Sequence, residues 1–142
     1  VIWQTGRFYF ERAKKFVDEK GFTNVWVNEF IGKMDAAYAA ADLVVCRAGA
    51  IAISELCLNR KAVILVPLPT AAADHQTKNA MQLVERDAAL LLPNAQAKEQ
   101  LIHKVLEVIR DENKLEILSN NIAKMAMGKS GEAIANEVLK LV

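Results

Sequence analysis

The chain has 142 residues, of which 53% are hydrophobic and 25% are charged, and its formal net charge is +1. This composition is typical of one globular domain with a single core, and it excludes an intrinsically disordered chain. The near-neutral charge creates no global attraction to nucleic acid, and no basic stripe interleaved with aromatic residues is present. No apolar run approaches the roughly 20 residues that a membrane-spanning helix needs. From the near-neutral charge and the missing basic stripe, we expect no nucleic-acid partner.

The N-terminal residues Val1–Gln4 look like the middle of a β-strand, and they resemble neither a start-methionine product nor a signal peptide. We interpret the chain as a fragment for this reason.

Short apolar runs alternate along the chain with longer stretches of helical periodicity. The expected strands are residues 1–4, 24–29, 43–46, 62–66 and 89–92. The expected helices are residues 7–20, 33–41, 50–59, 74–87, 96–110, 112–127 and 131–141. Repeated strand–helix units predict an α/β fold with a Rossmann-like parallel sheet, right-handed crossovers and helices on both faces.

Two cysteines, Cys46 and Cys57, lie in apolar surroundings, one at a strand end and the other inside a helix. No residues near them have metal-ligand spacing, and two cysteines are too few for the disulfide framework of a secreted domain. We expect buried, reduced thiols in a cytosolic protein.

Residues 42–79 read as strand, loop, helix, strand, loop, helix, and their polar residues follow the strand ends. Arg47-Ala48-Gly49-Ala50 is a turn of small residues directly before a helix. The free N–H groups and the dipole at a helix start bind phosphate. Glu55 lies about one turn further on, within reach of a sugar attached to that phosphate. Gln76 and Asn79 share one face of the next helix, so the segment predicts a pocket for a nucleotide-sugar.

Gly128-Lys-Ser-Gly131 superficially resembles a phosphate-binding loop, but it lacks a preceding strand and the full spacing of that motif. We interpret it as a helix-breaking turn.

Ordered motifs run through most of the chain. They are Asn28-Glu-Phe-Ile31, Met34, Ala36-Ala-Tyr-Ala-Ala-Ala-Asp42, Cys46-Arg-Ala-Gly-Ala50, Ser54-Glu55, Val66-Pro67 and Asp74-His-Gln76 with Asn79-Ala80. Through these motifs, at matching spacings, the chain resembles the MurG family of bacterial glycosyltransferases, which act in peptidoglycan synthesis. Gln4-Thr-Gly6 is also similar to the Gln-x-Gly turn of that family.

The resemblance implies an inverting GT-B glycosyltransferase that moves N-acetylglucosamine from UDP-N-acetylglucosamine (UDP-GlcNAc) to lipid I, the lipid-linked muramoyl pentapeptide, and so makes lipid II. Residues 1–142 would be its C-terminal donor-binding domain, incomplete at the N-terminus. The absent N-terminal domain would carry the catalytic base and the lipid I site. It would also place the enzyme peripherally on the cytoplasmic face of the bacterial inner membrane. We thus expect no catalytic residue, no cofactor and no metal in this chain, and no transfer activity from it alone.

Individual roles also follow from the resemblance. Ile31 would meet the uracil through its backbone, and Glu55 would hold the ribose hydroxyls, since a carboxylate accepts two hydrogen bonds from a diol. The residues expected along the diphosphate and the sugar are Ala50, Ile51 and Ala52, with Arg47 as an added cation, and then His75, Gln76 and Asn79.

Each role has a structural alternative. Glu55 is alternatively a solvated helix residue, and His75 a cap of the following helix or a residue facing water. Asn79 would then tie down its loop, and Arg47 would brace the loop through carbonyl groups.

The chain also departs from the family pattern. The family usually has serine at Ala48 and often threonine at Ala52, so two hydroxyl donors are absent while backbone contacts survive. Glycine and proline are favoured where Arg60 and Ala62 stand. A left-handed Arg60 would cost about 1 kcal/mol relative to glycine, so we expect the helix to end differently here. The alanine-rich loop 68–73 is expected to shift the sugar contacts.

In the family, a strand and a glycine-rich loop precede the position of Val1. That strand would lie centrally in a sheet of order 3-2-1-4-5-6. We therefore expect a break between the strands at 1–4 and 43–46, which residues outside this chain would fill or which the sheet would close.

Two other functions fit the sequence. One is a stand-alone UDP-sugar-binding subunit of a transferase made of two chains. The other is a different GT-B enzyme, such as a UDP-GlcNAc epimerase.

Overall fold

The computed structural model describes residues 1–128 and 130–141. The chain divides into two compact units, Val1–Ala41 and Asp42–Val142, and each is described by itself. Lys129 lies within the expected turn at Gly128–Gly131, so that interpretation falls outside the described residues.

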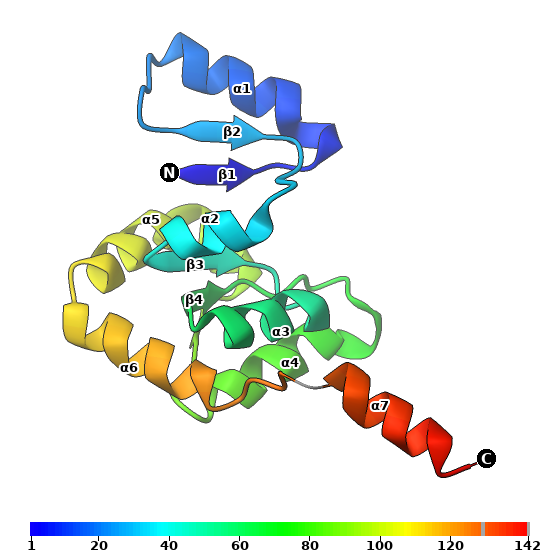
Figure 1. Cartoon of the computed structure of the whole chain (residues 1–142). Coiled ribbons are helices and arrows are strands. Elements are labelled where there is room, and N and C mark those ends of the chain that lie inside the picture. Colours follow the sequence, from blue (N-terminus) through cyan, green and yellow to red (C-terminus); the bar gives the residue numbers. More distant parts are fainter. Residues whose placement is uncertain (129, 142) are drawn as a thin grey trace. The chain divides into compact units, whose positions relative to one another are not determined.

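The first unit is a β-α-β arrangement followed by a short helix (Figure 1). Its strands pair in parallel, with Ile2 opposite Trp26 and Gln4 opposite Asn28. Helix α1 turns Ala13 and Val17, four residues apart, into the unit's interior. The elements are β1 (Ile2–Gln4), a 3-10 helix η1 (Arg7–Tyr9), α1 (Phe10–Glu19), β2 (Trp26–Asn28) and α2 (Met34–Ala40).

The second unit is a three-stranded parallel sheet, in the order β3-β4-β5, with helices packed against it (Figure 1). Helix α6 packs against β4, α4 against β5, and α3 against α6. The elements are β3 (Leu43–Cys46), α3 (Ala50–Asn59), β4 (Ala62–Leu65), η2 (Ala72–Asp74), α4 (His75–Val84), β5 (Leu90–Leu91), α5 (Asn94–Ile109), α6 (Glu112–Ala123) and α7 (Ser130–Leu139).

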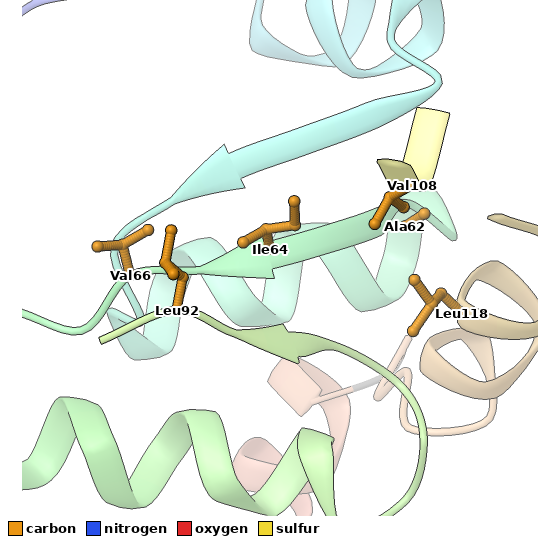
Figure 2. Packing of buried hydrophobic residues seen from close by; sticks show 6 residues of the cluster. All are labelled: Ala62, Ile64, Val66, Leu92, Val108 and Leu118. Atoms are coloured by element: carbon orange, nitrogen blue, oxygen red, sulfur yellow. The ribbon is translucent and has the colours of Figure 1, made fainter. Parts of the chain in front are cut away.

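The central strand β4 is fully buried, as a continuous apolar strand of a parallel sheet should be. Alternate residues of this strand and its extension point into one apolar cluster, which strand β5 and helices α5 and α6 complete. Figure 2 shows Leu92 near the Val66 end of the strand and Val108 near the Ala62 end. The cluster consists of Ala62, Ile64, Val66, Leu92, Val108 and Leu118.

The strands belong to two separate sheets, β1-β2 and β3-β4-β5, and no pairing joins β1 to β3 among the described residues. In the order 3-2-1-4-5-6, β1 and β2 correspond to strands 2 and 3, and β3, β4 and β5 to strands 4, 5 and 6. Without strand 1, this order predicts the two groups of paired strands that are observed. The expected break in strand pairing is confirmed among the described residues. What fills the position stays a prediction.

Several boundaries differ from the expected ones. The helix expected over 7–20 begins as a 3-10 turn, and the one over 74–87 ends at Val84. The helix expected over 96–110 starts earlier, at Asn94, directly after Pro93, which lies outside the helix with φ −57° and ψ 137°. The helix over 112–127 ends at Ala123.

The expectation that α3 ends differently was wrong. Arg60 adopts the left-handed conformation, with φ 55° and ψ 46°. Its N–H donates to the Cys57 carbonyl, and the N–H of Lys61 donates to the Leu56 carbonyl. This Schellman pattern satisfies carbonyl groups of the last turn. The two hydrogen bonds offset the strain that a side chain suffers at positive φ.

Replacing Arg60 by glycine should therefore stabilise the protein. We expect Arg60→Gly to raise the free energy of unfolding by about 0.5–1 kcal/mol, because glycine adopts positive φ without strain. The hydrogen bond from Arg60 to Asn120 is long, at 3.4 Å, and exposed, so its loss costs little. Urea unfolding followed by circular dichroism measures the change.

Arg110→Gly is the matched control. Arg110 is also an exposed arginine after a helix, but its φ is −91°. Glycine relieves no strain there and adds freedom to the unfolded chain, so a loss of about 0.5 kcal/mol is expected. Equal destabilisation by both substitutions would contradict the assignment of strain to Arg60.

Candidate functional site

The polar residues of the second unit gather where its parallel strands end. Arg47 follows β3, Pro67 follows β4 and Asn94 follows β5. Because the three strands run in parallel, their carboxyl ends lie at one edge of the sheet. Ligands of open α/β sheets bind at this edge.

Helix α3 begins at this edge with unsatisfied backbone N–H groups. Gly49 is the N-cap residue and has no side chain to cap the helix. The N–H of Ile53 bonds to the Gly49 carbonyl at 3.0 Å, so the preceding N–H groups have no partner within the helix. These belong to Ala50, Ile51 and Ala52. Ala50 and Ile51 are exposed, so this helix start has the groups and the dipole to bind an anion.

Asn79 fixes the turn that leads into α3. Its Nδ2 donates to the Ala48 carbonyl at 3.2 Å, although the two residues lie on different elements. Ala48 is fully buried. The loop-tying alternative for Asn79 is therefore present in the structure, and its contact with a sugar stays a prediction.

Arg47 joins the three strand ends. Its Nη1 donates to the carbonyls of Val66 at 3.0 Å and Pro67 at 3.3 Å, and to Asn94 Oδ1 at 2.6 Å. This is the bracing role through carbonyl groups that the sequence left as an alternative. A phosphate contact by Arg47 stays a prediction.

Gln76 and His75 hold the loop between β4 and α4. Gln76 Oε1 accepts from the Leu68 N–H at 2.9 Å. His75 Nδ1 lies 2.6 Å from the Ala72 carbonyl oxygen. A carbonyl only accepts, so Nδ1 carries the proton, and in the tautomer protonated at Nδ1 alone Nε2 of the exposed ring is an acceptor. A sugar hydroxyl is a suitable donor to it.

Glu55 lies one helical turn after Ile51 and therefore on the same face of α3. The residue is partly exposed. The carboxylate thus follows the open helix start on one face, the order needed to bind a diphosphate and then a diol. Its contact with ribose stays a prediction.

Ile31 belongs to the first unit and is described there alone. Its N–H donates to Gln4 Oε1 at 2.8 Å, and the residue is buried. The structure thus shows that Gln4 holds the loop that contains Ile31, a role that the sequence analysis did not assign to it. The Gln-x-Gly turn was the signal that could have found it. The uracil contact of Ile31 stays a prediction.

A cleft of about 410 Å³ lies beside the Arg47–Asn94 contact. Proline rings form much of its wall, and Asp74, Thr77 and Asn94 supply its polar groups. In the described part of the chain, no three His, Cys, Asp or Glu side chains gather as metal ligands. Within the same residues, no helix combines the length and the apolarity of a membrane span.

Comparison with models of protein families shows to which family the chain belongs. Residues 1–136 match the family model "Glycosyltransferase family 28 C-terminal domain". The chain belongs to this family. The match covers nearly all of both units and includes every residue of the candidate site.

Curated relatives carry the MurG function in their names. The transferase "UDP-N-acetylglucosamine--N-acetylmuramyl-(pentapeptide) pyrophosphoryl-undecaprenol N-acetylglucosamine transferase" of Parabacteroides distasonis is 46% identical over the whole chain. The enzyme of the same name from Phocaeicola vulgatus is 50% identical over 99% of the chain. The chain spans only 39% and 38% of these two relatives.

Solved structures show the same GT-B architecture. MurG of Acinetobacter baumannii matches 98% of the chain and 40% of its own length, with a TM-score of 0.86 and 26% identity. The glycotransferase of kitacinnamycin matches 87% of the chain and 30% of its own length, with a TM-score of 0.63 and 23% identity, and this likeness concerns the fold alone. The expected fold and family are thus confirmed.

Both cysteines have free thiols, as expected, but only Cys57, near the end of α3, is buried, while Cys46 at the end of β3 is half-buried. Burial raises the pKa of the Cys46 thiol from 9.0 to about 11. Burial also raises the pKa of Cys57, while a backbone hydrogen bond lowers it. The folded state therefore holds the Cys46 proton more tightly than the unfolded state does. The contribution of this difference to the free energy of unfolding is complete below pH 9. It is lost as the pH rises toward about 11.

Cys46 should therefore react slowly with thiol reagents at neutral pH. In a Cys57→Ser variant at pH 8, we expect iodoacetamide to modify the folded protein about 100-fold more slowly than the urea-unfolded protein, because only the thiolate reacts. The rate should climb steadily up to about pH 11. Mass spectrometry of timed samples measures it, and equal rates in the folded and unfolded protein at pH 8 would refute the raised pKa.

Proposed function

We propose that this chain is the donor-binding domain of an inverting transferase that moves N-acetylglucosamine from UDP-GlcNAc to lipid I, making lipid II for peptidoglycan. The single observation that carries the proposal is the open start of α3, followed on the same face by Glu55. The names of the two curated relatives support the proposed donor and acceptor, since they state both.

The proposed chemistry follows from the charges of the donor. Departure of UDP builds negative charge on its phosphates. The N–H groups of Ala50, Ile51 and Ala52 are fixed by α3, so they stabilise this charge without reorganising. The cation of Arg47 lies on the turn just before them. These groups assist the leaving group and need no cofactor of their own.

The sugars of the donor would meet acceptor groups. The carboxylate of Glu55 accepts hydrogen bonds from the ribose hydroxyls. Nε2 of His75 accepts from a hydroxyl of N-acetylglucosamine, with Gln76 and Asn79 on the same helix beside it. Ile31, with its loop held by Gln4, presents its backbone to the uracil.

The remaining parts of the reaction belong to sequence outside this chain. The relatives extend over more than twice its length, and we propose that the catalytic base and the lipid I site lie in the part that the chain does not cover. Because the proposed acceptor is lipid-linked, we also propose that the whole enzyme is a peripheral protein at the cytoplasmic face of the inner membrane. The chain alone would bind the donor without transferring the sugar.

Substitution of Glu55 tests the proposal. In the protein expressed from its whole reading frame, Glu55→Ala should weaken UDP-GlcNAc binding by about 1.5–3 kcal/mol, because a hydrogen bond to a charged group is lost. Isothermal titration calorimetry measures the change. Glu116→Ala, which removes an exposed carboxylate from helix α6, is the matched control and should leave the affinity unchanged.

A nucleotide that lacks the ribose 2′-hydroxyl completes this test. The 2′-deoxy analogue of UDP should bind the wild type more weakly than UDP does, whereas Glu55→Ala should no longer distinguish the two. Unchanged UDP-GlcNAc affinity in a folded Glu55→Ala protein would reject the ribose assignment. Failure of the wild type to bind UDP would reject the proposed function itself.

A further inference from the structure

Asn94 has no role in the site as the sequence predicts it, yet it makes the shortest contact of Arg47. Its Oδ1 lies 2.6 Å from Arg47 Nη1. Arginine only donates, so the amide oxygen of Asn94 faces the guanidinium and the amide nitrogen faces away. Asn94 is the first residue of α5, directly after the strand β5 and Pro93.

The guanidinium is held on one side only. All of its hydrogen bonds to described residues come from Nη1, which reaches the carbonyls of Val66 and Pro67 as well as Asn94. The two N–H groups of Nη1 are thus shared among three acceptors, while the N–H groups of Nε and Nη2 remain for another partner. The side chain is exposed, so such a partner can reach it.

Every acceptor that holds Arg47 is electrically neutral. Two are backbone carbonyls and the third is an amide. Among the described residues, no carboxylate forms an ion pair with Arg47. The positive charge is therefore positioned without being neutralised. An aspartate in place of Asn94 would have nearly the same shape and the same oxygen contact, but it would cancel this charge.

Arg47 is close in sequence to the proposed diphosphate site. Arg47 precedes Gly49, the cap of α3, by two residues, and the open N–H groups of Ala50, Ile51 and Ala52 follow at once. We propose that Asn94 is a positioning residue, which holds Arg47 beside the diphosphate through a neutral amide and leaves its charge to the phosphates. This inference rests on the proposed function, because it takes a nucleoside diphosphate as the ligand.

The substitution Asn94→Asp tests the role of the neutral amide in the protein expressed from its whole reading frame. We expect it to weaken UDP binding about threefold to fivefold at low salt, as suits a charge contact between exposed groups. High salt should shrink this difference, because ions screen exposed charges. Uridine carries no phosphate, so its affinity should not change. Calorimetry with UDP and with uridine gives both values.

Asn120→Asp is the matched control. Asn120 also accepts a hydrogen bond from an arginine, Arg60, but at the opposite end of α3. The substitution changes the net charge of the protein by the same amount and should leave both UDP and uridine binding unchanged. Thermal unfolding of both variants verifies that they are folded.

The outcomes separate the two proposals. A loss of UDP affinity in Asn94→Asp alone, with uridine unaffected, supports the inference. Equal UDP affinity in Asn94→Asp and Asn120→Asp overturns it, and so does an equal loss of UDP and uridine binding, which would mean that Asn94 only holds the fold. A wild-type protein that binds no UDP overturns the proposed function and this inference with it.

Discussion

Parallel pairing of β3, β4 and β5 is the constraint on which the candidate site depends. It brings the residues after three strands to one edge, although they are far apart in the sequence. The pairing depends in turn on β4, which is buried on both faces and packs one of them into the apolar cluster of Figure 2. A substitution that weakened the packing of β4 would therefore displace the loops at this edge, even if it altered no binding residue.

Side chains and backbone divide the work at this edge. Arg47, Gln76 and Asn79 each bind a backbone group of a neighbouring loop. The groups that they leave open are mainly the amides at the start of α3. Polar side chains thus act largely as a scaffold, and the backbone presents the donors. This division is consistent with the absence of the family's hydroxyl groups at Ala48 and Ala52, because backbone donors survive such changes.

The sequence predicted local features best. Strand Leu43–Cys46 and helix Ala50–Asn59 have the expected bounds, because an apolar run, a small-residue turn and a helical stretch follow one another there without conflict. The end of α3 was misjudged, since the penalty at Arg60 is local whereas the hydrogen bonds that offset it form only in the finished turn. Asn94 was missed because its partner is 47 residues away and no motif links the two.

Gly49 has a consequence for protein engineering. Its φ of −71° suits any residue, and an added Cβ would meet no atom within 4 Å, so serine or aspartate would fit. Either would cap α3 by accepting a hydrogen bond from one of its first amides. A programme that selects substitutions for heat resistance alone would thus favour this position and occupy the amides proposed for the donor. A side-chain cap that stabilises α3 and a bound nucleotide would both accept hydrogen bonds from the same amide groups.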